Sequence, residues 1–191
     1  ARIVDGVLKS YNIDKTDGEQ FYSIACDTYG NVWALSDLGN IFIFNEQVLI
    51  DKISSSKIFD RGLVYSINSD ESGNLWFGSS LNEVYYIRFD TSYYPNDLNA
   101  HERFLISTGE VTNINHIQPL PDNTAIISAL NGFGYVNIDR EFIRVDSPKN
   151  TNAISANWGA RDSQGNLWLA SSKNRHSHIF LPCRFFPAQE S

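Results

Sequence analysis

Several features that would point to a catalytic or membrane protein are missing from this 191-residue sequence. It has no Cys-x-x-Cys pair, no phosphate-binding glycine loop and no nucleophile elbow, which argues against the thiol-redox, nucleotide-hydrolysing and serine-hydrolase classes. No run of residues approaches the 18 or more apolar residues of a membrane-spanning helix. Methionine is absent altogether, and cysteine occurs only at Cys26 and Cys183. Because Cys26 falls inside a predicted strand, we expect a buried thiol rather than a disulfide.

The sequence is also poor in basic residues. It has 15 Lys and Arg against 22 Asp and Glu, for a net charge of -7. Phosphate contacts need clustered cations, so a nucleic-acid partner is not expected. The hydrophobic fraction of 42% is that of a globular protein.

One seven-residue motif occurs three times: DTYGNVW at 27–33, DESGNLW at 70–76 and DSQGNLW at 162–168. The first two copies begin 43 residues apart, and a degenerate copy, LPDNTA at 120–125, lies between the second and third. Four repeats of about 45 residues indicate stacked structural units. Gly-Asn suits a tight turn with positive φ, and the preceding Asp is predicted to cap the amides of that turn. The Trp is predicted to be buried between neighbouring sheets.

The segments around each motif alternate as β-strands do. FYSIACD, VYSINSD and ANWGARD precede the turns, and aromatic or β-branched runs such as IFIFN and VYYIRF follow. No segment has helical periodicity. The predicted fold is all-β: a β-propeller of four-stranded antiparallel blades, with about four blades present. The repeats are expected at about 21–63, 64–110, 111–153 and 154–191, and 1–20 is expected to supply outer strands of a preceding or closing blade.

The motif resembles the two-component regulator propeller repeat, in which an aliphatic residue is followed by Asp-x-x-Gly-Asn-Leu-Trp and a small-residue strand. The match is good in three repeats and spans roughly 21–180. The third repeat lacks the Gly and the Trp, and the usual Gly-Thr after the Trp strand is replaced by other residues. The resemblance implies the periplasmic or cell-surface sensor region of a hybrid two-component histidine kinase, with seven-bladed propellers that recognise polysaccharide breakdown products.

Seven blades at this spacing would need about 300 residues. The chain is therefore interpreted as part of a larger propeller, which would need further blades or a second protomer against its open faces. The alternative is a small four-bladed ring in which the N-terminal strand completes the last blade.

Ligands of propellers are expected where loops meet at one end of the central channel. Aligning the repeats on Gly-Asn places Trp158 and Asn157 at the start of an innermost strand, where Ser23 and Tyr22 stand in the first repeat. An aromatic face beside an amide suits a sugar ring. The alternative is that Trp158 fills a gap between blades.

Nearby loops add further candidates. Asp37 and Asn131 follow second strands, Arg61 precedes an inner strand, and Lys173 and Arg175 form a basic segment, SSKNRHSH. Cations in such loops suit an anionic sugar through charge-assisted hydrogen bonds, although a solvated loop is the alternative.

The predicted function is a non-enzymatic carbohydrate-binding sensor module with no catalytic residues, cofactor or metal. His176 and His178 have the spacing of two ligands on one side of a strand, but no third ligand accompanies them. Two alternatives remain: a propeller enzyme of the streptogramin lyase or sugar lactonase type, and a purely structural propeller that contacts other proteins.

Overall fold

The computed structural model describes residues 2–4, 7–9, 18–46, 48–90, 92, 97–98, 100–145, 156–162, 166–171 and 179–182. Within these residues the chain forms β-strands and a single turn of 3-10 helix, η1 (Ser55–Lys57). No α-helix is present in this part of the chain, which confirms the all-β prediction.

Four consecutive antiparallel sheets contain most of the strands, and their order in each sheet is their order in the chain. The first sheet is β3 (Phe21–Cys26), β4 (Val32–Ser36), β5 (Asn40–Asn45) and β6 (Val48–Ser54). The second is β7 (Val64–Ser69), β8 (Leu75–Ser79), β9 (Glu83–Arg88) and β10 (Glu102–Ser107). The third is β11 (Ile114–Leu120), β12 (Thr124–Ala129), β13 (Gly132–Asn137) and β14 (Phe142–Arg144). The fourth is β15 (Ala156–Arg161), β16 (Asn166–Ser171) and β17 (Ile179–Pro182).

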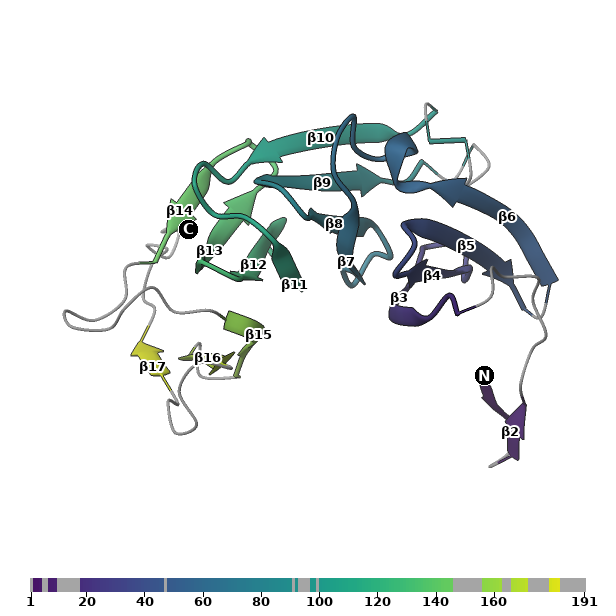
Figure 1. Cartoon of the computed structure of the whole chain (residues 1–191), viewed down its shortest axis with the longest axis horizontal. Helices are drawn as coiled ribbons and strands as arrows, with labels where there is room; N and C mark the ends of the chain where they lie inside the picture. The colour runs from purple at the N-terminus through teal and green to yellow at the C-terminus, as the bar shows by residue number, and fades with distance from the viewer. Residues whose placement is uncertain are drawn as a thin grey trace, which may run out of the picture.

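The sheets lie side by side in an arc, with β3, β7, β11 and β15 toward its centre (Figure 1). This is the blade arrangement that the repeats predict. The N-terminal strands β1 (Arg2–Val4) and β2 (Val7–Lys9) pair with each other. Neither joins β17, so the described strands do not form the ring-closing blade of the alternative prediction.

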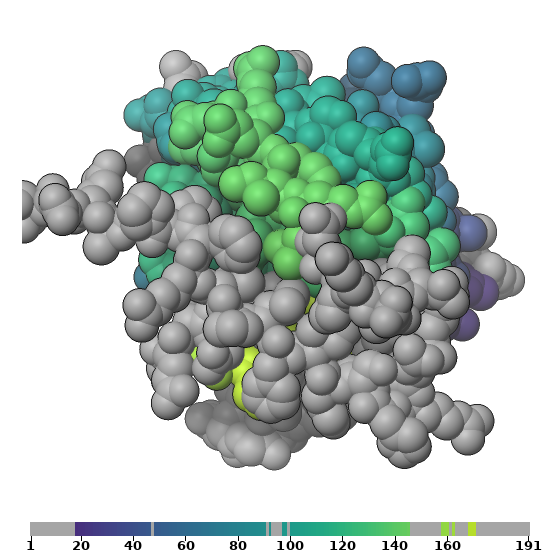
Figure 2. Space-filling view, turned by 90° about the vertical axis from the view of Figure 1, so that its left-hand side faces the viewer, coloured from purple at the N-terminus to yellow at the C-terminus, as the bar shows by residue number. Residues whose placement is uncertain are grey.

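Apolar side chains fill the spaces between consecutive sheets. Trp33 and Phe77 belong to a cluster that joins the first and second sheets, and their rings lie 6.2 Å apart. Trp76 belongs to the cluster between the second and third sheets, and Leu169 to a smaller one between the third and fourth. The third sheet (green) packs against the second (teal) in the view of Figure 2. Trp33 and Trp76 thus each cover the face of their blade that meets the following blade.

The prediction of a buried Trp is confirmed for Trp33 and Trp76, which are both fully buried. It is wrong for Trp168, which is 39% exposed. Leu169, the next residue, faces the third sheet, so strand alternation directs Trp168 to the opposite face. No described sheet covers that face.

The prediction of a buried Cys26 thiol is also wrong. Cys26 is a free cysteine and is exposed, whereas its neighbour Ala25 faces the second sheet. Cys26 lies on the other face of β3 together with Ile24, which is 67% exposed. Burial of a strand residue depends on whether another sheet covers its face. Cys183 lies outside the described residues.

The turn chemistry predicted from the motif is confirmed. Asp27 Oδ1 accepts hydrogen bonds from the amides of Tyr29 and Asn31, both at 2.9 Å. Asp70 accepts the equivalent bonds from Ser72 and Asn74. Gly30 and Gly73 have φ of 79° and 76°, which glycine adopts with little cost. In the degenerate repeat Asn123 takes the positive φ instead, at 58°.

Candidate functional site

Each inner strand carries a bulge at its second residue. The register shifts between Phe21 and Ser23, between Val64 and Ser66, between Ile114 and His116, and between Ala156 and Trp158. A bulge leaves one residue unpaired and changes the direction of its side chain, and bulges are common beside binding sites. The four bulged residues are Tyr22, Tyr65, Asn115 and Asn157, one from each blade.

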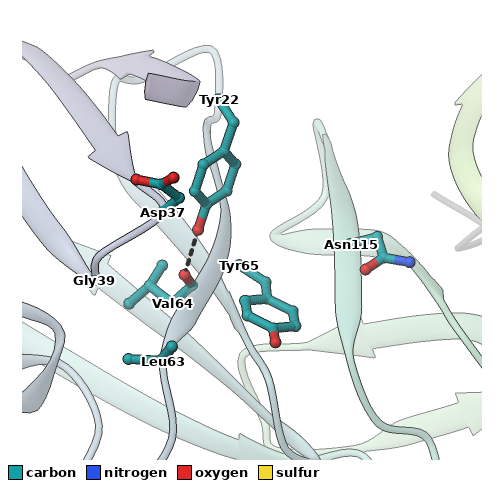
Figure 3. A pocket seen from close by; sticks show the side chains of 7 residues that line it. All are labelled: Tyr22, Asp37, Gly39, Leu63, Val64, Tyr65 and Asn115. Atoms are coloured by element: carbon teal, nitrogen blue, oxygen red, sulfur yellow. Dashed lines mark hydrogen bonds between the residues drawn. The ribbon is translucent and has the colours of Figure 1, made fainter. Parts of the chain in front are cut away.

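Three of these residues surround a cavity at the end of the channel (Figure 3). The cavity has a volume of about 340 Å³, and its wall is completed by Asp37, Gly39, Leu63 and Val64. The lining comes from three successive blades: Tyr22 from the first, Tyr65 from the second and Asn115 from the third. A site of this kind depends on the blades being held together, because no single repeat supplies it.

Some polar groups of the cavity are hydrogen-bonded within the protein, and others are not. The Tyr22 hydroxyl donates to the Val64 carbonyl at 2.7 Å and so ties the first blade to the second. Burial raises the pKa of Tyr22 above its usual value, and the neighbouring Tyr65 and Asp37 side chains add to the effect. Tyr65 and Asn115 have no hydrogen-bond partner among the described residues. Their hydroxyl and amide groups are therefore available to a ligand.

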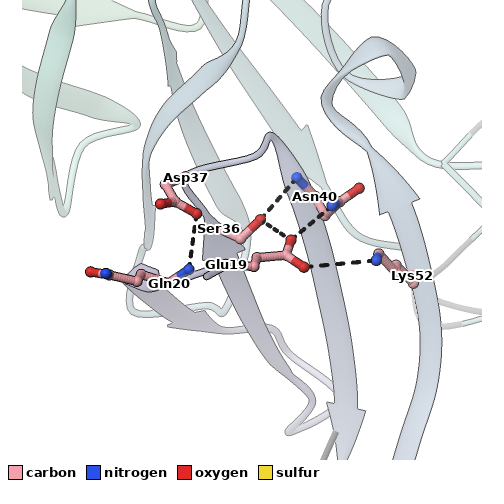
Figure 4. Close-up of polar contacts among 6 residues, drawn as sticks. All are labelled: Glu19, Gln20, Ser36, Asp37, Asn40 and Lys52. Carbon is pink, nitrogen blue, oxygen red and sulfur yellow. Dashed lines mark hydrogen bonds and ion pairs between the residues drawn. The ribbon is translucent and has the colours of Figure 1, made fainter. Parts of the chain in front are cut away.

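Asp37 is held at the cavity by its own turn. Its Oδ1 accepts the amide of Gln20 at 2.9 Å, and its amide donates to the Gln20 carbonyl at 3.0 Å. Beside it, the buried carboxylate of Glu19 accepts from Ser36 Oγ at 2.6 Å and from Asn40 Nδ2 at 2.7 Å (Figure 4). Lys52 lies 4.0 Å from the other oxygen of Glu19. These contacts fix the turn, so Asp37 lines the cavity from a hydrogen-bonded support.

The other residues predicted as ligand contacts are dispersed. Arg61 is exposed in the loop before β7 and is not part of the cavity lining. Asn131 accepts from the Thr112 amide at 2.8 Å and donates to the Glu110 carbonyl at 2.7 Å, so it braces a loop of the third blade. The side chain of Asn157 lies outside the described residues, as do Lys173, Arg175, His176 and His178. Their predicted roles remain predictions.

Trp158 belongs to a second repeated position, directly after the bulge. In the preceding blades this residue bonds to the next inner strand: Ser23 Oγ to the Ile67 carbonyl at 3.1 Å and Ser66 Oγ to the Ile114 carbonyl at 3.0 Å. His116 Nδ1 likewise accepts the amide of Gly159 at 3.3 Å.

The fourth member of this series, Trp158, is 60% exposed and stacks on His116 with ring centroids 3.9 Å apart. Burial lowers the pKa of His116 to about 4, so the stacked imidazole is neutral at pH 7. Since the position makes contacts between blades in the three preceding repeats, it favours a blade contact for Trp158 over a ligand contact.

The sequence analysis did not select Tyr22, Tyr65 or Asn115 as ligand contacts. The signal was present, because Tyr22 and Tyr65 align with Asn157 in the repeats. What the sequence did not reveal was the bulge, which sets these side chains apart from their alternating neighbours.

In the described part of the chain, His, Cys, Asp and Glu nowhere gather in a group of three that would hold a metal ion. No helix in the same described part of the chain is long and apolar enough to cross a membrane.

No protein-family model matches the sequence, and no curated protein matches it either. Solved structures do match. The extracellular domains of two hybrid two-component systems from B. thetaiotaomicron superpose with TM-scores of 0.56 and 0.58, at 16% and 20% identity. Each match covers 79% of this chain, which spans only 20% and 19% of those proteins. Sensor domains of this class are thus among its structural neighbours, consistent with the resemblance of its repeats.

Enzymes share the same fold. Virginiamycin B lyase from Staphylococcus aureus superposes with a TM-score of 0.66 at 13% identity, covering 96% of this chain and 62% of the lyase. At such low identities these similarities establish the β-propeller fold but not the activity, which depends on the residues of the site.

Proposed function

We propose that this chain is a non-enzymatic ligand-binding module in the extracytoplasmic, periplasmic or cell-surface sensor of a hybrid two-component system, and that its ligand is a carbohydrate bound in the channel-end cavity. The observation that carries the proposal is the pair of uncommitted polar groups on Tyr65 and Asn115, which face one cavity together with Asp37. A phenol ring offers a flat face to a sugar, and hydroxyl, amide and carboxylate groups match its hydroxyls.

The cavity supports binding rather than catalysis. Its lining includes one carboxylate, Asp37, and no histidine, cysteine or lysine among the described residues. The groups most often used for proton transfer and nucleophilic attack are thus not gathered there, and metal-assisted chemistry needs a cluster of ligands. We therefore do not propose the activity of the lyase neighbours for this chain.

Further blades are proposed to cover the two open faces. On the first sheet Ile24 is 67% exposed, and on the last sheet Trp168 is 39% exposed. In the second and third sheets, the equivalent faces are covered by a neighbouring sheet. Apolar faces of this kind are covered in closed propellers, and a second protomer is the other candidate. Ligand-dependent packing of such propellers would transmit the signal.

Calorimetric titration of the chain against neutral and acidic oligosaccharides tests the proposal. Tyr65→Phe keeps the ring and removes only the hydroxyl, while Asn115→Ala removes the amide. Each is expected to weaken binding of the responsive oligosaccharide about three- to tenfold, with an unchanged melting temperature. Incubation should leave the oligosaccharide chemically intact.

Arg61→Ala and Trp158→Ala serve as controls from outside the cavity. Retained affinity in both controls, together with weakened binding by Tyr65→Phe and Asn115→Ala, would place the ligand in the cavity. Loss of affinity in a folded Trp158→Ala protein, with Tyr65→Phe unaffected, would move the site to the last inner strand. Absence of binding across the panel would contradict carbohydrate recognition by this chain and favour a structural propeller.

A further inference from the structure

A second pocket lies away from the channel, where the loop after β6 meets the outer strands of the second blade. Its volume is about 350 Å³. Three basic side chains reach it from different parts of the chain: Lys57 from η1, Arg103 from β10 and Arg140 from the turn between β13 and β14. Asp60 is the one acidic residue of the lining. The pocket therefore has an excess of positive charge in a chain whose net charge is -7.

These cations are not used by the fold as ion-pair partners. The described ion pairs join Lys52 to Glu19 and Arg88 to Glu102. Within the described residues no carboxylate oxygen lies within 4.0 Å of Lys57, Arg103 or Arg140. Three exposed cations that converge without an ion-pair partner among the described residues repel one another, and an anion between them would relieve this repulsion.

The pocket also has a firm apolar wall. Phe59 and Tyr85 are almost fully buried, with ring centroids 5.8 Å apart in an edge-to-face arrangement. Leu105 is 45% exposed and pairs with Tyr85 across β9 and β10. Arg103 lies two residues before Leu105, so strand alternation puts both on the same face. The guanidinium thus stands beside an apolar surface that suits the body of a small molecule.

Tyr85 adds a neutral hydroxyl to this wall. Its pKa is raised above the usual value, chiefly by burial, while the charge of Arg103 and a hydrogen bond with it act in the opposite direction. Tyr85 is therefore uncharged at neutral pH and does not repel an anion, which leaves Asp60 as the acidic residue of the lining.

We propose that this pocket binds the tetrahedral oxyanion of a sulfated or phosphorylated sugar. Arg103 and Arg140 supply planar forks of N–H donors for the oxygens of the ester, Lys57 adds a point charge, and Leu105 contacts the sugar ring. The site is separate from the channel-end cavity, shares no lining residue with it, and does not depend on the function proposed for that cavity.

The test uses the whole chain with glucose 6-sulfate and glucose 6-phosphate as probes, and glucose as the uncharged reference. Titration at low ionic strength is expected to show saturable binding of at least one ester, no binding of glucose, and weakening as salt is added. Arg103→Gln is expected to weaken binding about tenfold or more, with smaller losses for Lys57→Gln and Arg140→Gln. All three side chains are exposed, so the variants should fold.

Arg88→Gln is the matched control. It removes the same charge from the neighbouring strand β9, where Arg88 is already paired with Glu102 at 2.7 Å. Unchanged affinity in this variant would show that the pocket, and not net charge, binds the ester. Equal weakening by Arg88→Gln and Arg103→Gln would overturn the proposal, as would absence of saturable binding to either ester. A Tyr65→Phe protein should bind the esters normally, which separates failure at this pocket from failure at the channel end.

Discussion

The carboxylate of Asp27 accepts a hydrogen bond from the indole Nε1 of Trp33 at 2.8 Å, six residues further along the chain. Asp162 and Trp168 make the same bond at 3.0 Å. In these two copies the first and last residues of the repeated motif are therefore bonded to each other. In the second repeat Asp70 accepts from the Tyr86 hydroxyl at 3.2 Å instead, and the buried Trp76 Nε1 has no hydrogen-bond partner among the described residues.

Removing the Asp27 carboxylate should destabilise the first blade. This side chain is 5% exposed and accepts four hydrogen bonds, from two backbone amides, the Asn31 amide group and Trp33. Asp27→Ala is expected to lower the free energy of unfolding by about 2–4 kcal/mol, measured by urea denaturation. The control is Asp122→Ala in the degenerate repeat, where the side chain is exposed and bonds Thr124 Oγ1. Its cost should stay below about 1 kcal/mol, and equal costs would argue against the turn-capping role.

Trp33 and Trp76 should respond differently to the same substitution. Both are fully buried, but only Trp33 has a hydrogen bond to lose. Trp33→Phe is expected to cost about 1 kcal/mol more than Trp76→Phe, because the change at Trp76 also removes an unsatisfied buried donor. Chemical denaturation of the two variants under identical conditions measures the difference. A larger loss for Trp76→Phe would contradict the assignment.

Two motif glycines with the same backbone conformation should differ in tolerance. Gly30 and Gly73 have φ of 79° and 76°, but a Cβ at Gly30 would meet nothing within 4 Å. A Cβ at Gly73 would lie 2.5 Å from Thr28 Cα in the turn of the preceding blade. Gly30→Ala is expected to cost about 1–2 kcal/mol from strain alone, and Gly73→Ala at least about 2 kcal/mol more from the clash. Comparable melting temperatures for the two variants would show that the turns are not in contact.

His116 should make stability depend on pH. Its pKa in the folded chain is lowered to about 4 by burial, from an ordinary value of 6.5. The folded state therefore disfavours the protonated form. The contribution of the neutral imidazole is fully present above pH 6.5 and is lost progressively as the pH falls toward 4.

A His116→Asn variant isolates this effect from the titration of carboxylates. The stability difference between the parent and the variant should shrink as the pH falls from 7 to 4.5, when both are followed by urea denaturation at each pH. A difference that stays constant over this range would mean that His116 does not titrate with folding.

The repeats predicted the blade order and the turn chemistry because those features depend on residues close together in the chain. The Asp, Gly and Asn of each motif act within one hairpin, so their spacing carries the information. The burial of Trp168 and Cys26 was predicted wrongly for the opposite reason. A strand residue is buried only if another sheet covers its face, and the repeat pattern is identical whether or not that sheet follows.

The residues of the candidate site likewise fall into those that local sequence predicted and those that only the packing of blades brought together. Asp37 was predicted from its place after a second strand, and it does line the channel-end cavity. Tyr65 and Asn115 were not selected, because their role depends on a bulge and on the approach of three blades. The basic pocket of Lys57, Arg103 and Arg140 had no sequence signal at all, since its residues lie far apart in the chain.

The all-β architecture, the repeat and the turns follow from the order of residues alone, because local hydrogen bonding and strand alternation depend on neighbours in the chain. Which faces are covered, where Tyr22, Tyr65 and Asn115 meet and which cations converge became evident only from the folded chain. These are properties of the packing between blades, and residues separated by one or more repeats acquire a common environment only when the blades are assembled side by side.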